Sequence, residues 1–223
     1  LASAARRGIL IKGGIYLEDA RKLKVIALDK TGTITEGKPK LVATEILDQT
    51  VSEKVILEWA GSLAALSNHP VSKAISTALA PSATVVDHFM ALPGRGVQGR
   101  IGNQDLILGN HRLIEERKLC GPAIEARLVE HEAQGRTMTL LANESGVLAI
   151  FAVADTIKPH AREAISTLHA LGAKAVMLSG DNQATAQAVA AQANVDDARG
   201  NLLPDDKLKA IEALQKEFGP TAM

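Results

Sequence analysis

Residues 25–37, VIALDKTGTITEG, are the stretch that decides the fold. Four apolar residues lead directly into Asp29, and a polar turn containing Gly32 follows at once. A short apolar run that ends in turn residues predicts a buried strand. Because open parallel sheets bind ligands just beyond the carboxyl ends of their strands, this strand would carry the Asp29 carboxylate into a binding site.

The composition suits a sheet covered by helices. Hydrophobic residues make up 46% of the 223 residues and aromatic residues only 2%, so the core must be built from Ala, Val, Leu and Ile. The 25 basic and 25 acidic residues cancel, which gives no basis for a nucleic-acid partner. One cysteine excludes an internal disulfide, and no apolar run reaches the roughly 18 residues of a membrane helix, so we expect the chain itself to be soluble.

The same strand-then-helix pattern occurs further along the chain. Residues 147–155 and 174–182 each begin with an aliphatic run that ends in an aspartate-containing polar segment. Helical periods follow at 158–172, 184–193 and 201–219, with prolines near their starts or glycines near their ends. Strands alternating with helices predict βαβ units, and therefore an α/β domain with a parallel sheet.

The middle of the chain has a different pattern, which predicts an inserted α+β domain on an antiparallel sheet. Helical periods occupy 52–66, 70–80 and 122–134, and the strand candidates are 84–92, 96–101, 104–108 and 137–142. Glycine- and asparagine-bearing turns separate these strands, as in hairpins. We predict one discontinuous domain at 1–38 and 148–223 and an inserted domain at 39–147, with the links at 36–41 and 146–155 acting as hinges.

Two of the strand ends bring reactive side chains to the same sheet edge. The crevice would be lined by Asp29, Lys30, Thr31, Ser179 and Asp181. A carboxylate in such a place can attack a phosphoryl group and form an acyl phosphate. Backbone N–H groups of KTGT would hold the phosphate oxygens, Lys207 would neutralise developing charge, and the combination calls for Mg²⁺.

A simpler interpretation is that Asp29 caps a turn and Lys30 is solvated. A lone Asp-Lys pair would deserve that interpretation. Here DKTGT, SGDN and PDDK all occur at the strand ends or helix starts that the chemistry requires, which favours the phosphoryl-transfer site.

These motifs resemble those of P-type ATPases, the pumps that form an aspartyl phosphate. DKTGTIT resembles their phosphorylation motif, SGD (Ser179, Gly180 and Asp181) their TGD motif, and LLPDDK their proline-and-lysine motif. The resemblance implies a haloacid dehalogenase-like phosphorylation domain in which Asp29 is phosphorylated. It also implies that Mg²⁺ is held by the Asp29 carboxylate and the Thr31 carbonyl, with a further aspartate beyond Met223, in a Gly-Asp-Gly-x-Asn-Asp loop.

Thr31 separates pump from phosphatase within this fold. Phosphatases of the superfamily carry an acid two residues after the nucleophile, whereas this chain has a threonine there. Threonine cannot deprotonate a hydrolytic water at neutral pH, so the acyl phosphate is expected to persist.

The inserted domain resembles the nucleotide-binding domain of the heavy-metal-transporting branch. SNHPVSKAI, PGRGVQG and LGNHRL match its Ser-x-His-Pro, glycine-pair and asparagine elements. The resemblance implies that His69, Gly94, Gly96 and Asn110 contact ATP. Ala64 stands where the branch often has a glutamate that reads the adenine amine, which puts base recognition in doubt.

The resemblance implies a catalytic unit that is part of a longer polypeptide, together with membrane helices and an actuator domain. It would lie on the cytoplasmic face of a membrane protein, in a bacterial inner membrane. The residues before the DKTGT motif resemble those of zinc, cadmium, lead or cobalt pumps more than those of copper pumps.

The remaining histidines lack metal-ligand spacing and Cys120 is expected to be structural, so we expect the transported metal not to bind in this chain. Asp155 is assigned a hinge or Mg²⁺-side structural role.

Two other functions stay open at this point. One is a haloacid dehalogenase-like phosphohydrolase with a cap domain, which predicts an acid at position 31 and turnover of small phosphate esters. The other is a non-catalytic nucleotide-binding module that regulates a partner, which predicts ATP binding without a covalent phosphate.

Overall fold

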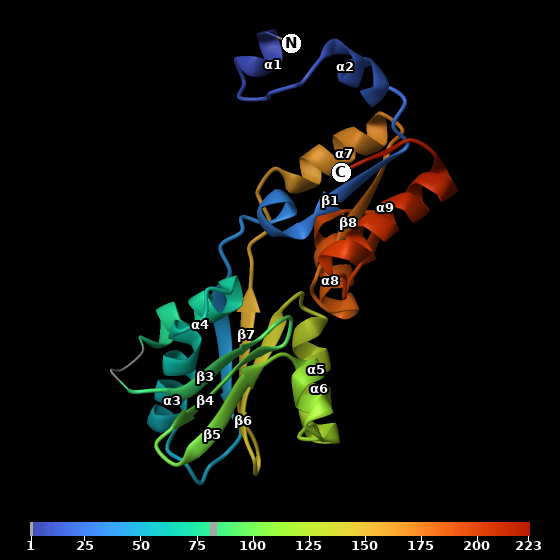
Figure 1. Cartoon of the computed structure of the whole chain (residues 1–223). Helices are drawn as coiled ribbons and strands as arrows, with labels where there is room; N and C mark the ends of the chain where they lie inside the picture. Colours follow the sequence, from blue (N-terminus) through green and yellow to red (C-terminus); the bar gives the residue numbers. More distant parts are fainter. Residues whose placement is uncertain (1, 81–83) are drawn as a thin grey trace. The chain divides into compact units, whose positions relative to one another are not determined.

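The computed structural model describes residues 2–80 and 84–223. The chain forms two compact units, and each has its own sheet (Figure 1). Unit 1 comprises Leu1–Lys30 and Pro159–Met223, and unit 2 comprises Thr31–Lys158. Within residues 2–80 and 84–223, no helix combines the length and apolar character needed to cross a membrane.

Unit 1 is built on a four-stranded parallel sheet. The strand order is β10-β1-β8-β9, and every pairing is parallel. The strands are β1 (Val25–Asp29), β8 (Lys174–Leu178), β9 (Asp197–Arg199) and β10 (Thr221–Ala222). The helices are α1 (Ala2–Ala5), α2 (Gly14–Ala20), α7 (Ala161–Ala170), α8 (Gln183–Ala193) and α9 (Pro204–Phe218). The predicted parallel sheet is therefore confirmed.

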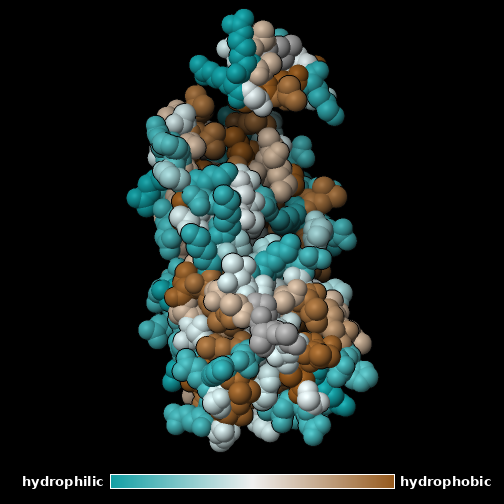
Figure 2. Space-filling model, turned by 90° about the vertical axis from the view of Figure 1, so that its left-hand side faces the viewer, coloured by the Kyte–Doolittle hydropathy of each residue, from teal (hydrophilic) through white to brown (hydrophobic). Residues whose placement is uncertain are grey.

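The centre of unit 1 is the contact between α9 and the two middle strands. Ala210 and Leu214 of α9 pack against Val25 and Val176 in one buried cluster. Alternate residues of β8, such as Met177, are buried on the opposite face, so this strand is covered on both sides. By contrast, α1 and α2 contain no buried residue, and hydrophobic residues of this N-terminal segment are visible at the surface in Figure 2.

Unit 2 is built on a six-stranded antiparallel sheet with the order β2-β7-β6-β5-β4-β3. The strands are β2 (Lys40–Ile46), β3 (Asp87–Leu92), β4 (Gly96–Ile101), β5 (Gln104–Gly109), β6 (Thr137–Asn143) and β7 (Gly146–Ala154). The helices are α3 (Glu53–Ala65), α4 (Pro70–Leu79), α5 (His111–Glu116) and α6 (Pro122–Glu132). The predicted α+β architecture of this segment is confirmed.

Helices cover both faces of this sheet, with α3 and α4 on one side and α5 and α6 on the other (Figure 1). Two separate cores result. Phe151 and Val153 of β7 belong to the core shared with α3 and α4. Ile150 and Ala152, which alternate with them, belong to the core shared with α5 and α6.

The prediction that residues 147–155 form a strand of the parallel sheet is wrong. This strand is β7, which pairs antiparallel with β2 and β6 inside unit 2. The sequence misled here because β7 contributes to a core on each face of its sheet. A strand buried on both faces is continuously apolar whether its sheet is parallel or antiparallel. Sequence analysis also missed β2, β9, β10 and α5, which are short or polar on one face.

The borders between the compact units, 30/31 and 158/159, differ from the domain limits predicted from sequence. The predicted hinge segments lie within unit 2, where β7 fills most of the second one. Next to these segments the chain forms a short two-stranded ribbon. Thr35 and Ile157 form an antiparallel β-bridge, and Lys158 N donates to Ile34 O at 2.9 Å. The predicted domain limits stay a prediction.

Candidate active site

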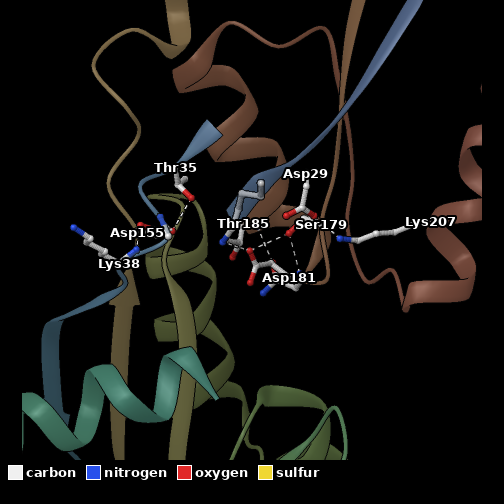
Figure 3. Close-up of polar contacts among 11 residues, drawn as sticks. Asp29, Thr35, Lys38, Asp155, Ser179, Asp181, Thr185 and Lys207 are labelled. Atoms are coloured by element: carbon white, nitrogen blue, oxygen red, sulfur yellow. Dashed lines mark hydrogen bonds and ion pairs between the residues drawn. The ribbon is translucent and has the colours of Figure 1, made fainter. Parts of the chain in front are cut away.

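Asp29 is the last residue of β1 and lies opposite Leu178 at the carboxyl edge of the parallel sheet. Lys207, in the first turn of α9, reaches it and forms an ion pair (Figure 3). The Asp29 side chain keeps 34% of its surface exposed and the Lys207 side chain 26%. The structure thus places a carboxylate at the strand end, beside a cation and still open to solvent.

The loop after β8 brings a second carboxylate to the same edge. Ser179 follows β8 directly and is 3% exposed. Its Oγ donates to Asp181 Oδ2 at 3.1 Å and accepts from the Asp181 backbone N at 3.1 Å. Lys30, which is 8% exposed, forms an ion pair with Asp181. The alternative of a solvated Lys30 is therefore wrong.

The start of α8 holds this loop in place. Asn182 Oδ1 accepts from Thr185 N at 2.7 Å, which caps the helix. The Gln183 side chain bridges to β9, because Oε1 accepts from Gly200 N and Nε2 donates to Ala198 O, each at 2.7 Å. Sequence analysis missed Gln183, since a helix-start glutamine gives no signal without its distant partners. Gly180, the middle residue of SGD, is exposed.

A tight turn over Lys30–Ile34 follows Asp29. Thr31 is extended (φ −75°, ψ 121°), and Gly32 adopts the left-handed conformation (φ 76°) that lets the chain turn. Thr31 and Gly32 are both exposed. Lys158 binds this turn, because its Nζ donates to Gly32 O and its backbone N donates to Ile34 O. The predicted phosphate and Mg²⁺ contacts of the turn stay a prediction.

Asp155 in unit 2 organises the segment that follows this turn. Its Oδ2 accepts from Thr35 Oγ1 at 2.6 Å and from Gly37 N at 3.0 Å, and its Oδ1 accepts from Lys38 N at 3.0 Å (Figure 3). These contacts are those of a structural cap. Thr35 is 1% exposed, and its part in this cap was missed because its partner Asp155 lies 120 residues further along the chain.

The four predicted nucleotide contacts lie at helix starts, in a turn and at the start of β4 in unit 2. His69 is exposed and caps α4, with Nδ1 accepting from Val71 N at 3.3 Å. Asn110 caps α5 and its Nδ2 donates to Gly94 O at 2.9 Å, so it fixes the glycine turn. A side chain at Gly96 would approach Leu108 O within 2.3 Å, so only glycine fits there. Their contacts with ATP stay a prediction.

Two further observations bear on nucleotide binding. Ala64 lies near the end of α3 and is fully buried in the core that α3 shares with the sheet. A cavity of about 460 Å³ opens elsewhere in unit 2, and it is lined by residues such as Gln98, Asp105 and Arg117. None of the four predicted nucleotide contacts lines this cavity.

The fold and this site define the class of protein. Residues 23–223 match the family model "Hydrolase: haloacid dehalogenase-like hydrolase". The chain belongs to the haloacid dehalogenase-like hydrolase family.

Within that family the relatives are metal-transporting ATPases, as the sequence motifs predicted. A probable cadmium-transporting ATPase of Alkalihalophilus pseudofirmus is 35% identical over 231 residues, covering 100% of this chain and 32% of that protein. A copper-exporting P-type ATPase of Bacillus subtilis is 36% identical over 223 residues, covering 99% and 28%. The chain therefore spans about a third of the length of the curated relatives that it matches.

Solved structures agree with these relatives. The chain is similar to a zinc-transporting PIB-type ATPase in its E2.Pi state, with a TM-score of 0.68, 34% identity, and coverage of 100% of this chain and 36% of that one. The catalytic domain of a CPx-ATPase, 23% identical, shares the fold with a TM-score of 0.71 over 96% of this chain and 75% of that one.

Proposed function

We propose that this chain is the ATP-binding and phosphorylation unit of a P-type ATPase that exports a divalent heavy-metal cation of the zinc, cadmium, cobalt or lead class. The observation that carries the proposal is the Asp29–Lys207 ion pair at the carboxyl edge of the parallel sheet. Copper exporters match at the same level of identity. The choice of metal therefore rests only on the resemblance of the residues before the DKTGT motif to those of zinc, cadmium, cobalt or lead pumps. Membrane helices and an actuator domain of the same polypeptide would perform transport.

The proposed reaction is the transfer of the γ-phosphoryl group of ATP to Asp29. One carboxylate oxygen attacks the γ-phosphorus, the bond between this phosphorus and the β,γ-bridging oxygen breaks, and ADP leaves. Lys207 would neutralise charge on the transferred oxygens, and Ser179 would donate a hydrogen bond to them. Lys30 would hold Asp181 in position through its ion pair.

The donor set at this site fits Mg²⁺, which prefers oxygen ligands and few carboxylates. Asp29 offers a partly exposed carboxylate, and Thr31, an exposed residue of the following turn, would offer its backbone carbonyl. When bound, the ion would polarise the phosphoryl oxygens and offset their charge. In unit 2, His69, Gly94, Gly96 and Asn110 would hold the adenine and ribose of ATP.

The test is labelling with ATP radioactive at the γ-position, in the chain extended by the Gly-Asp-Gly-x-Asn-Asp loop of the family, with Mg²⁺ and an acid quench. We expect an acid-stable, hydroxylamine-labile phosphate on the wild type and none on Asp29→Asn. Lys207→Ala should slow labelling by about 100-fold or more, as loss of a charge-stabilising donor does. Lys209→Ala, on the same helix with 75% of its side chain exposed, is the matched control.

Each alternative function has its own signature in this assay. ATP binding without any covalent label on the wild type would favour the regulatory module. Turnover of small phosphate esters without any need for ATP would favour the phosphohydrolase.

A further inference from the structure

Three side chains that can ligate metals meet where α5 joins α6, on the face of unit 2 opposite α3 and α4. His111 begins α5, Cys120 lies in the connection, and Glu125 lies in the first turn of α6. Their ligand atoms all lie within 4.8 Å of one another. His111 Nε2 is 2.9 Å from Glu125 Oε1. The three residues come from two helices and a loop, so the tertiary structure creates this cluster.

The cluster is partly shielded from water. The His111 side chain keeps 26% of its surface exposed and that of Glu125 keeps 40%. Burial and hydrogen bonding to Glu125 raise the pKa of the Cys120 thiol to about 12. Hydrogen bonds from Cys120 and His111 hold the pKa of Glu125 below its usual range. Without metal, the thiol proton and the imidazole thus both converge on one carboxylate.

We propose that His111, Cys120 and Glu125 form a binding site for a soft divalent metal ion of the zinc class, with water as the fourth ligand. Imidazole nitrogen, thiolate sulfur and carboxylate oxygen are the ligand types that Zn²⁺ takes in tetrahedral sites. Ligand atoms on one such ion lie about 3.3–3.8 Å apart. The three ligand atoms here lie within 4.8 Å of one another, so small side-chain movements bring them to that spacing. The metal–sulfur bond forms as the Cys120 thiol proton leaves to solvent.

The donor set also decides against Mg²⁺, the ion proposed for the site at Asp29. A thiolate is a soft ligand, whereas Mg²⁺ prefers oxygen donors and retains its waters. The site would therefore be distinct from the proposed Mg²⁺ ligands Asp29 and Thr31 in chemistry. The spacing of nine and five residues matches no metal motif, which is why the sequence led us to expect no metal here.

Co²⁺ titration of the reduced chain tests the proposal, because a cobalt–thiolate bond has a charge-transfer absorption that oxygen ligands cannot produce. We expect saturation at one Co²⁺ per chain, displacement by Zn²⁺ or Cd²⁺, and a complex that remains monomeric. Cys120→Ser should abolish the thiolate absorption. His111→Ala and Glu125→Gln should each weaken Co²⁺ affinity by more than the roughly 10-fold lower limit seen for loss of an outer-shell partner.

The matched control is His160→Ala, because His160 has 89% of its side chain exposed and lies outside the cluster. This variant should bind Co²⁺ like the wild type. Circular dichroism establishes that each variant is folded before titration. The proposal is overturned by a wild type without thiolate absorption, by one Co²⁺ shared between two chains, or by folded His111→Ala and Glu125→Gln variants that bind like the wild type.

Discussion

Asp29 and Thr31 stand two residues apart in the same turn, and the proposed function depends on the difference between them. Asp29 supplies a carboxylate at the strand end, while the Thr31 side chain is an exposed hydroxyl. A carboxylate at position 31 would have the basicity to deprotonate an attacking water, which a threonine hydroxyl lacks. Under the proposed function, the side chain at position 31 would therefore decide how long an acyl phosphate on Asp29 survives.

We therefore predict that Thr31→Asp increases the hydrolysis rate of the phosphorylated chain. General-base catalysis contributes about 100-fold or more, so a rise of at least tenfold in the decay rate of the labelled protein is expected. Thr31→Asn, which has the same shape without the basicity, should decay like the wild type. Equal decay of the Asp and wild-type phosphoproteins would rule out this role of Thr31.

At the scale of elements, one ion-pair network fastens α6 to β2. Arg127 Nη1 donates to Glu45 Oε2 at 2.6 Å, and His131 Nε2 lies 2.6 Å from Glu45 Oε1. Arg136 Nη1 is 2.9 Å from His131 Nδ1. Since a guanidinium only donates, Nδ1 accepts and the Nε2 hydrogen points to Glu45. The hydrogen bond from His131, assisted by Arg127, lowers the pKa of Glu45 below its ordinary 4.5.

This shift predicts a pH dependence of stability. A depressed carboxylate pKa stabilises the fold above the unfolded value, and that stability is lost as pH falls from about 4.5 through the lowered pKa of Glu45. Glu45→Gln should cost about 1 kcal/mol at pH 7 and less at pH 3.5. Urea unfolding at both pH values measures the difference.

Glu130→Gln is the control for that measurement, because Glu130 lies on the same helix and is exposed. It should change the free energy of unfolding little at either pH. A loss in Glu45→Gln that is the same at pH 7 and pH 3.5 would mean that the carboxylate charge plays no part.

At the scale of the whole molecule, the chain divides into one continuous and one discontinuous unit. Unit 2 runs without interruption over Thr31–Lys158 and contains both of its cores. Its central strand β7 pairs with β2 on one side and β6 on the other. The ribbon formed by Thr35 and Ile157 closes this unit beyond the ends of β2 and β7.

We predict that residues 31–158 fold alone, whereas residues 39–147 do not. The shorter segment lacks most of β7, so it loses Phe151 from one core and Ile150 from the other. Circular dichroism and thermal unfolding of the two segments measure this, with a cooperative transition expected only for 31–158. A cooperative transition in 39–147 would support the domain limits predicted from sequence instead.

Much of the fold and the candidate site could be predicted from short stretches of sequence. The run ending at Asp29, the proline at the start of α9 and the glycine- and asparagine-bearing turns beside β4 and β5 are local signals. They located most helices and strands within a few residues. They also identified Asp29, Ser179, Asp181 and Lys207 as residues that lie at the carboxyl edge of the sheet.

Other features depend on residues far apart in the chain, so no local pattern could reveal them. The continuous apolar run of β7 fits either sheet, and only its antiparallel pairing with β2 and β6 decided which one. Likewise, Lys30 meets Asp181, and His111 meets Cys120 and Glu125, through tertiary packing. The sequence by itself determined most of the elements and the strand end that carries Asp29. Only the tertiary structure decided which buried strand joins which sheet and which side chains become partners, because these contacts form between segments whose order along the chain does not specify their neighbours in space.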